Sequence, residues 1–230
     1  MTARRPGALV AAPLLAALAL TAACNQSADA RPGAAANGPA AGKFTAPEYV
    51  LGDAKAKVTV VEYLSNTCSH CAHFDQTYFP EIKKAYVDTG KVKWVIREFL
   101  TDPVQVSAPG FVLARCAGRD KYWGVVESLF ATQAELFKSG DARGYLYKTG
   151  KAAGMTDAQI NTCLADDQAY KDLNARVEKA VNQNKITGTP TFVVNGKQLQ
   201  PGATLAGQRF DGTDLKPAMF ADVYRQAGGK

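Results

Sequence analysis

The stretch Val58-Thr59-Val60-Val61-Glu62-Tyr63-Leu64, closely followed by Cys68-Ser69-His70-Cys71, decides how the rest of this chain is interpreted. The first run is apolar at both odd and even positions, so it predicts a central strand over residues 57–64 that is covered on both faces. A helical pattern starts at residue 68, which places Cys68 at a helix N-terminus, where free N–H groups and the helix dipole stabilise a thiolate. Cys71 lies within reach of Cys68, so the two can form a small disulfide or be attacked one sulfur at a time.

The neighbouring segments extend this strand and helix into an α/β order. Residues 49–52 predict a short edge strand, and residues 68–87 predict one helix that is kinked at Pro80 and ended by Gly90. Residues 91–99 return to a strand pattern. The two longer strands should therefore be parallel neighbours joined by a right-handed crossover.

A block with only helical patterns follows, at about residues 103–185. The helices predicted in this block cover residues 111–117, 122–137, 156–164 and 166–184. Strand character resumes over 191–194 and 197–199, with Asn195-Gly196 between them as a strong hairpin signal. A last helix is predicted over residues 215–225. This order is that of a thioredoxin fold with an inserted helical subdomain.

The first 42 residues are not expected to belong to the fold. Residues 1–23 have a positive start and a short apolar run, which is typical of an export signal and too short for a comfortable membrane span. The sequence Leu20-Thr21-Ala22-Ala23-Cys24 is similar to a lipobox, which would make Cys24 a lipidation site, although ordinary signal cleavage nearby stays open. Residues 24–42 read as a flexible tether. A single domain is expected over residues 43–230.

The charge of the chain is only mildly positive, with 27 Lys and Arg against 21 Asp and Glu. The basic residues alternate with acidic ones, as in Arg176-Val177-Glu178-Lys179, which favours a solvated surface over a nucleic-acid site. The predicted export says more about function than the charge does, because it places the five cysteines in an oxidising compartment.

A second motif, Gly188-Thr189-Pro190-Thr191-Phe192, lies directly before the hairpin. Together with Glu62-x5-Cys68-Ser69-His70-Cys71, it makes residues 47–228 resemble the DsbA-like thiol-disulfide oxidoreductases of bacterial envelopes. A lone C-x-x-C would also fit half a zinc site, but no second pair follows at metal-site spacing, so no metal and no cofactor are expected.

The resemblance implies a role for each residue of the two motifs. Cys68 is expected to be the nucleophile and Cys71 the buried resolving thiol. His70 should help to stabilise the Cys68 thiolate, unless it is only a polar residue at a helix start. Glu62 should be a buried acid that moves the proton of Cys71, with a structural ion pair as its alternative. The peptide bond between Thr189 and Pro190 is expected to be cis and to face the cysteines.

The resemblance also bears on the remaining cysteines. Some relatives carry a second disulfide in the inserted helices, which implies a bond between Cys116 and Cys163, with two buried free thiols as the alternative. Cys24 is then left without a partner, which favours its lipidation.

Three functions remain open at this point. The chain is expected to donate the Cys68–Cys71 disulfide to unfolded or reduced exported proteins, and to be reoxidised by a membrane partner. It would act as a monomer in the periplasm or cell envelope, attached to the membrane only through a lipid. An isomerase or reductase would use the same thiols in the other direction. An envelope copper chaperone would instead use Cys68, Cys71 and His73 as ligands.

Overall fold

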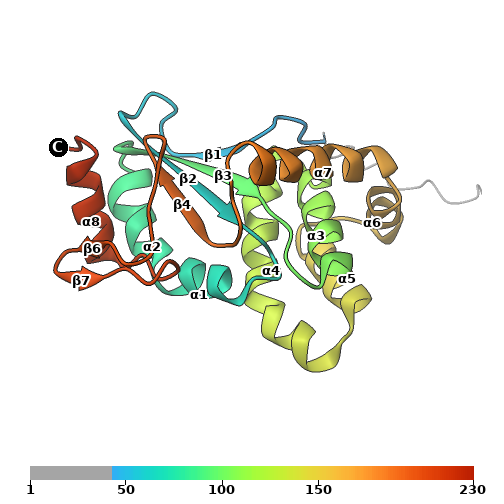
Figure 1. Cartoon of the computed structure of the whole chain (residues 1–230). Coiled ribbons are helices and arrows are strands. Elements are labelled where there is room, and N and C mark those ends of the chain that lie inside the picture. The colour runs from blue at the N-terminus through green and yellow to red at the C-terminus, as the bar shows by residue number, and fades with distance from the viewer. Residues whose placement is uncertain (1–42) are drawn as a thin grey trace, which may run out of the picture. The chain divides into compact units, whose positions relative to one another are not determined.

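A five-stranded mixed sheet in the order β1-β3-β2-β4-β5 forms the centre of the fold (Figure 1). The computed structural model describes residues 43–230, so the predicted export signal, the tether and Cys24 lie outside the described residues. No helix within residues 43–230 is long and apolar enough to cross a membrane. The strands are β1 (Tyr49–Leu51), β2 (Val58–Leu64), β3 (Val92–Glu98), β4 (Thr191–Val194) and β5 (Lys197–Gln198).

The strand β2 lies in the middle of the sheet, as its two apolar faces predict. It pairs in parallel with β3, with Val60 opposite Trp94, and antiparallel with β4. This confirms the predicted strand-helix-strand unit. The hairpin between β4 and β5 turns at Asn195 and Gly196, which have φ values of 45° and 82° that suit a tight two-residue turn.

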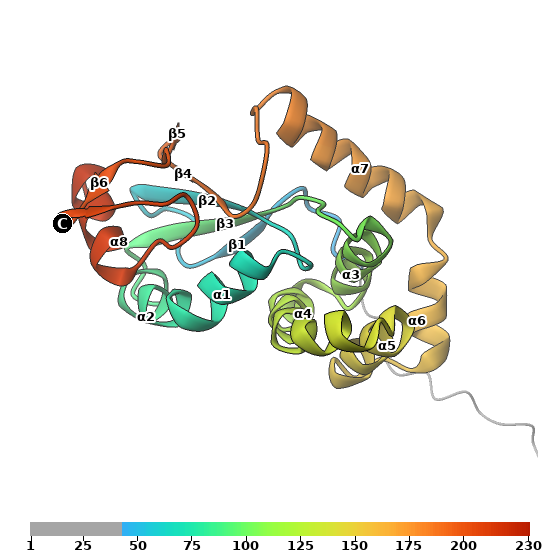
Figure 2. The same ribbon diagram turned by 60° about the horizontal axis from the view of Figure 1, so that its bottom comes forward.

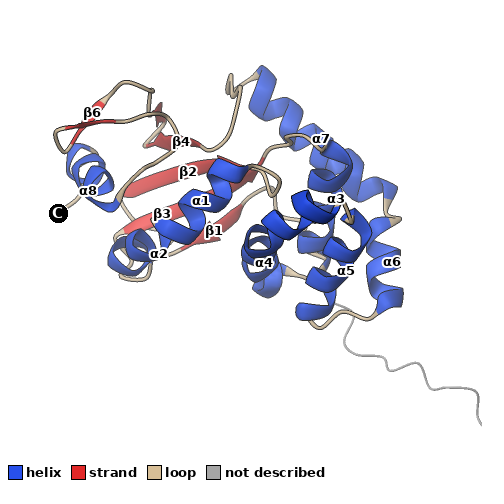
Figure 3. Cartoon of the chain, turned by 90° about the horizontal axis from the view of Figure 1, so that it is seen from below, coloured by secondary structure: helices blue, strands red, loops and turns tan. Residues whose placement is uncertain are grey.

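Helices cover one face of the sheet through a cluster of aromatic rings. These helices are α1 (Ser69–Thr77), α2 (Phe79–Ile82) and α8 (Pro217–Gln226), and Figure 3 shows α1 and α2 in front of the strands. The indole of Trp94 packs against Phe74, Phe79 and Phe220, one ring from each helix. Residues of β2 with even numbers face this cluster, so Glu62 points into the main core.

The predicted helix over residues 68–87 is divided. It consists of α1, α2 and a π-helical segment η1 (Lys83–Val87), with the first break at Tyr78. Pro80 has no N–H to continue the hydrogen-bond ladder and its ring displaces the preceding turn, so the expected kink becomes a break.

Five helices form the block between β3 and β4 and confirm the predicted α/β fold with an inserted helical subdomain. They are α3 (Val104–Cys116), α4 (Arg119–Ser139), α5 (Ala142–Ala152), α6 (Asp157–Leu164) and α7 (Asp167–Asn182). The structure differs from the sequence prediction at two places in this block. The helix α3 starts at Val104 and not at residue 111, and α5 was not predicted. Pro109 and Gly110 both lie inside α3, although proline and glycine disfavour a helix interior. A Cβ at residue 110 would come within 2.7 Å of the Asn66 side chain, so glycine allows the helix to approach the loop after β2.

The C-terminal region contains a small hairpin that was also not predicted. It pairs β6 (Thr204–Leu205) with β7 (Gln208–Arg209) through Ala206 and Gly207. Ala206 has a φ of 49°, which is unusual for alanine, and its N–H donates to Asp222 Oδ2 on α8 at 3.0 Å. The turn therefore depends on a tertiary contact that the local sequence does not reveal.

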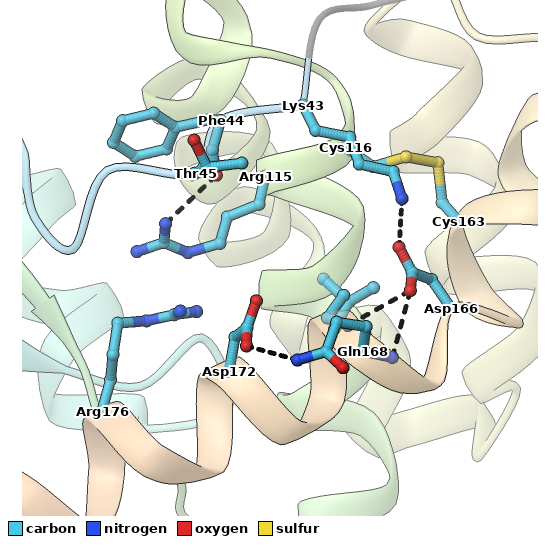
Figure 4. Close-up of a pocket in the computed structure, with 12 residues that line it drawn as sticks. Lys43, Phe44, Thr45, Arg115, Cys116, Cys163, Asp166, Gln168, Asp172 and Arg176 are labelled. Carbon is cyan, nitrogen blue, oxygen red and sulfur yellow. Dashed lines mark hydrogen bonds and ion pairs between the residues drawn. A yellow bond between two sulfur atoms is a disulfide. The ribbon is translucent and has the colours of Figure 1, made fainter.

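A disulfide joins Cys116 at the end of α3 to Cys163 in α6, with a Cα–Cα distance of 5.9 Å. The bond lies at one end of a pocket of about 200 Å³ between residues 43–45 and the inserted helices, where Lys43 pairs with Asp166 (Figure 4). Arg115 and Arg176 lie toward the other end of the same pocket.

Arg115 and Arg176 share a buried partner, Glu98, at the end of β3. Its carboxylate accepts hydrogen bonds from Arg115 Nε, from Arg176 Nε at 2.8 Å and from the Tyr122 hydroxyl at 3.1 Å. Glu98 is 3% exposed. Glu178 and Lys179 are exposed, as expected for a solvated surface, whereas the Arg176 side chain is only 20% exposed. Its ion pair with Glu98 joins α7 to the sheet together with α3 and α4.

Candidate active site

Cys68 is the N-cap residue of α1, the position that the sequence predicted. Its Sγ accepts a hydrogen bond from the Cys71 backbone N–H at 3.2 Å. The side chain of Cys71, the side chain of Thr189 and the N–H groups of Cys71 and His70 together lower the pKa of Cys68 to about 6, although burial opposes this shift. The two cysteines are free thiols in this structure. A group with this pKa is largely a thiolate, the nucleophilic form of cysteine, at neutral pH.

Cys71 lies one turn further along α1 and has the opposite environment. It is fully buried, and its burial, followed by the effect of the adjacent Cys68, raises the pKa of Cys71 well above its ordinary value. The two sulfurs are therefore not equivalent: Cys68 is poised to attack, whereas Cys71 holds its proton.

The loop before β4 lies beside the cysteines. The Thr189–Pro190 peptide bond is cis, and the Thr189 carbonyl oxygen accepts a hydrogen bond from Cys68 Sγ at 3.3 Å. These residues are far apart in the sequence and meet because β4 pairs directly with β2.

Glu62 lies in the core of the sheet and is 2% exposed. Its Oε2 accepts a hydrogen bond from Trp94 Nε1 at 2.9 Å. Burial raises the pKa of Glu62 to about 8, and the nearby Asp75 and Cys68 act in the same direction. Within residues 43–230, no cation lies within ion-pair distance of Glu62, so the alternative of a structural ion pair finds no support.

Asp75 is a second buried carboxyl group that was not identified from the sequence. It lies on α1, four residues after Cys71, and is 8% exposed. Burial, with the charge of Glu127 on α4, raises the pKa of Asp75 to about 7. The spacing from Cys71 could have revealed it, because residues four apart share one helix face. Asp75 and Glu62 thus form a pair of carboxyl groups that resist ionisation in the same part of the core.

Replacing Glu62 with glutamine should change how stability depends on pH. Because the pKa of Glu62 is raised from 4.5 to about 8, the folded protein keeps a proton that the unfolded chain loses between these values. The free energy of unfolding of the unaltered protein should therefore fall as pH rises through this window, by at most about 1.4 kcal/mol per pH unit from this group. Glu62→Gln should remove that contribution, which denaturant titrations at several pH values would measure.

The exposed Glu135→Gln variant is the matched control and should keep the slope of the unaltered protein. Asp75 keeps its own contribution in all three proteins. Identical slopes in Glu62→Gln and the unaltered protein would contradict the assignment of a buried, protonated Glu62.

The two histidines near the cysteines lie in different surroundings. The side chain of His70 is exposed, and it is the His70 N–H that contributes to the low pKa of Cys68. His73 Nδ1 lies 3.3 Å from the Thr77 hydroxyl, and His73 Nε2 lies 3.8 Å from Asp214. In the described part of the chain, no three His, Cys, Asp or Glu side chains are placed to hold a metal ion. The ligand set of the copper alternative is therefore not assembled.

A C-x-x-C pair at a helix N-terminus, opposite a cis-proline loop and on a mixed sheet of this order, defines the class of thioredoxin-fold proteins. A family model described as thioredoxin matches residues 45–208. A Rickettsia bellii protein named "Putative protein-disulfide oxidoreductase" is 35% identical over 159 residues, which cover 69% of this chain and 61% of that protein. Disulfide bond formation protein D of Bacillus subtilis is 30% identical over 161 residues, which cover 66% of this chain and 69% of that protein.

Solved structures agree with this class. Wolbachia pipientis alpha-DsbA1 has a TM-score of 0.67 at 24% identity, and the match covers 80% of this chain and 94% of that chain. Oxidised BdbD from Bacillus subtilis has a TM-score of 0.60 at 24% identity, covering 82% and 98%. This chain belongs to the thioredoxin family. It spans about 54 to 61% of the length of the Rickettsia relatives that it matches.

Proposed function

We propose that this protein is a thiol-disulfide oxidoreductase that donates its Cys68–Cys71 disulfide to other proteins. The observation that carries the proposal is the contrast between the two sulfurs, with the pKa of Cys68 lowered to about 6 and that of Cys71 raised. The names of the relatives, which are protein-disulfide oxidoreductases, support the same activity.

The reaction proceeds through a mixed disulfide. A substrate thiolate attacks Cys68 Sγ of the oxidised protein, and the bond between the sulfurs breaks, so that Cys71 leaves with the electron pair. The leaving Cys71 takes a proton, which Glu62 supplies through the core. A second substrate thiolate then attacks the substrate sulfur that is bound to Cys68. This step releases an oxidised substrate and leaves Cys68 as a stabilised thiolate.

The direction in which the disulfide is transferred follows from the low pKa of Cys68, which leaves as a thiolate in the last step. A thiolate with a low pKa leaves readily, and its stability favours the reduced form of the pair, which makes the disulfide an oxidant. The cis-proline loop contributes a docking edge beside Cys68, where an extended substrate can pair with the backbone as an added strand.

The remaining parts of the proposal concern location and partners. Residues 1–23 act as an export signal and Cys24 is lipidated, so that residues 24–42 tether a monomeric domain to the envelope membrane. The substrates are reduced or unfolded exported proteins. Because each transfer leaves the protein reduced, a membrane partner must accept its two electrons before the next cycle.

The pKa of Cys68 in the reduced full chain provides the first test. Thiolate absorbance, or the rate of alkylation against pH, should show a thiol titrating near pH 6 that mass spectrometry assigns to Cys68. The reduced protein should also resist denaturant better than the oxidised one. A Cys68 pKa near that of free cysteine would overturn the proposal, and greater stability of the oxidised form would favour a reductase instead.

A further inference from the structure

Gln133 on α4 makes a direct connection between the inserted helices and the reactive cysteine. Its side chain is 4% exposed, and its Nε2 donates to two carbonyl oxygens, Asn66 O at 2.9 Å and Cys68 O at 3.2 Å. An amide nitrogen has two hydrogens, so this geometry occupies both of them. Asn66 and Cys68 belong to the loop that joins β2 to α1. Figure 2 shows that α4 lies next to the N-terminal end of α1, where this loop ends.

Other hydrogen bonds also hold the loop between β2 and α1, but they are made by Asn66 and Thr67 and not by Cys68. Asn66 Nδ2 donates to Ser107 O on α3 at 2.8 Å, and the Thr67 hydroxyl lies 2.9 Å from that of Thr101. Gln133 is the side chain from the inserted helices that contacts the backbone of Cys68 itself. Its two acceptors lie on either side of Thr67 and therefore fix the path of the chain into α1.

The backbone of Cys68 determines whether its sulfur meets the helix N–H groups. Cys68 has φ and ψ of −81° and 117°, and this extended geometry allows Sγ to accept from the Cys71 N–H. The same residue's carbonyl accepts from the Ala72 N–H at 3.1 Å, the first hydrogen bond of the helical turn. Rotation of this carbonyl would move Sγ away from the N–H groups that stabilise its negative charge.

We propose that Gln133 is a positioning residue that holds the Cys68 peptide so that the N-terminus of α1 stabilises the thiolate. Through this contact the inserted subdomain sets the reactivity of a cysteine that belongs to the thioredoxin core. The inference rests on the proposed function, because it names a residue that tunes the same redox pair.

The test replaces Gln133 with methionine, which has a similar length and no donor. We expect the pKa of Cys68 to rise by about one unit, so that about tenfold less thiolate is present at a pH below the pKa. The equilibrium between the Cys68–Cys71 pair and glutathione should shift about tenfold, toward the oxidised protein. Absorbance of the thiolate and the redox equilibrium are both measured on the full chain.

Leu136→Ala is the matched control, because Leu136 is buried on the same helix and makes no hydrogen bond to the loop. This variant should lose stability and keep the pKa of Cys68. Gln133→Asn retains the amide but is one methylene shorter, so it cannot reach both carbonyls. It should raise the same pKa, and it serves as the test if the methionine variant does not fold.

The inference is overturned if both Gln133 variants only lose stability, with the pKa of Cys68 and the glutathione equilibrium within twofold of the unaltered protein. Failure of the proposed function would look different. In that case the unaltered protein itself would show an ordinary Cys68 pKa and no transfer of a disulfide.

Discussion

Replacing Cys71 with serine is expected to leave substrates attached to Cys68 and to reduce turnover by at least about a thousandfold. Without Cys71 the Cys68–Cys71 disulfide that the protein donates cannot form. Cys71 also lies one helical turn from Cys68, so in the unaltered protein its attack on a mixed disulfide that fails to proceed is intramolecular. Such positioned groups gain effective concentrations far above those of free thiols. Without this second thiol, the reduced variant should form a mixed disulfide with an oxidised substrate and then stop.

Non-reducing electrophoresis and mass spectrometry would detect the adduct and place it at Cys68. Cys68→Ser is the matched control: it loses turnover equally and forms no adduct, because the buried Cys71 has a raised pKa and stays protonated. A Cys71→Ser protein that keeps a tenth or more of its turnover would exclude Cys71 as the resolving thiol. An adduct at Cys71 in the Cys68→Ser variant would reverse the two roles.

Replacing Glu98 with glutamine is expected to cause the largest loss of stability, about 3 to 5 kcal/mol of unfolding free energy, as is typical when one partner of a buried ion pair is removed. The change leaves Arg115 and Arg176 positively charged, with no carboxylate between them. It also weakens the hydrogen bond from Tyr122, so α3, α4 and α7 lose their shared attachment to the end of β3.

Glu48→Gln provides the comparison, because Glu48 pairs with Arg97 of the same strand but its side chain is 33% exposed. An exposed pair contributes about 1 kcal/mol or less, so this variant should unfold at nearly the denaturant concentration of the unaltered protein. Equal losses of unfolding free energy in the two variants would show that the buried ion pairs of Glu98 stabilise the protein no more than an exposed pair does. Oxidised samples should be used for both, so that the Cys116–Cys163 bond is the same throughout.

The parts of the fold and site that were predictable depend on short-range patterns. The apolar run of β2 has no polar face, which only a central strand explains, and Asn195-Gly196 specifies a turn by its own backbone preferences. Cys68 and Cys71 follow the strand at once, so their place at a helix start could be inferred without tertiary information.

The parts that were missed depend on contacts between distant segments. Pro109 and Gly110 argue against a helix locally, and α3 continues through them because it packs closely on Asn66. Gln133 looks like any polar residue of an amphipathic helix until the loop carbonyls are placed beside it. Asp75 carries a visible spacing from Cys71, but its raised pKa comes from burial that only the assembled core provides.

The position of β4 has a consequence for the order in which the candidate site is assembled as the chain is made. Residues 191–194 fill the edge of β2, yet they are made after all five inserted helices. Until they pair, β2 has a free edge and Cys68 has no Thr189 beside it, so a chain that emerges N-terminus first carries an incomplete site. Such long-range pairings are closed late and slowly. The surroundings of Cys68 are therefore completed only after Cys116 and Cys163 are already present in the chain.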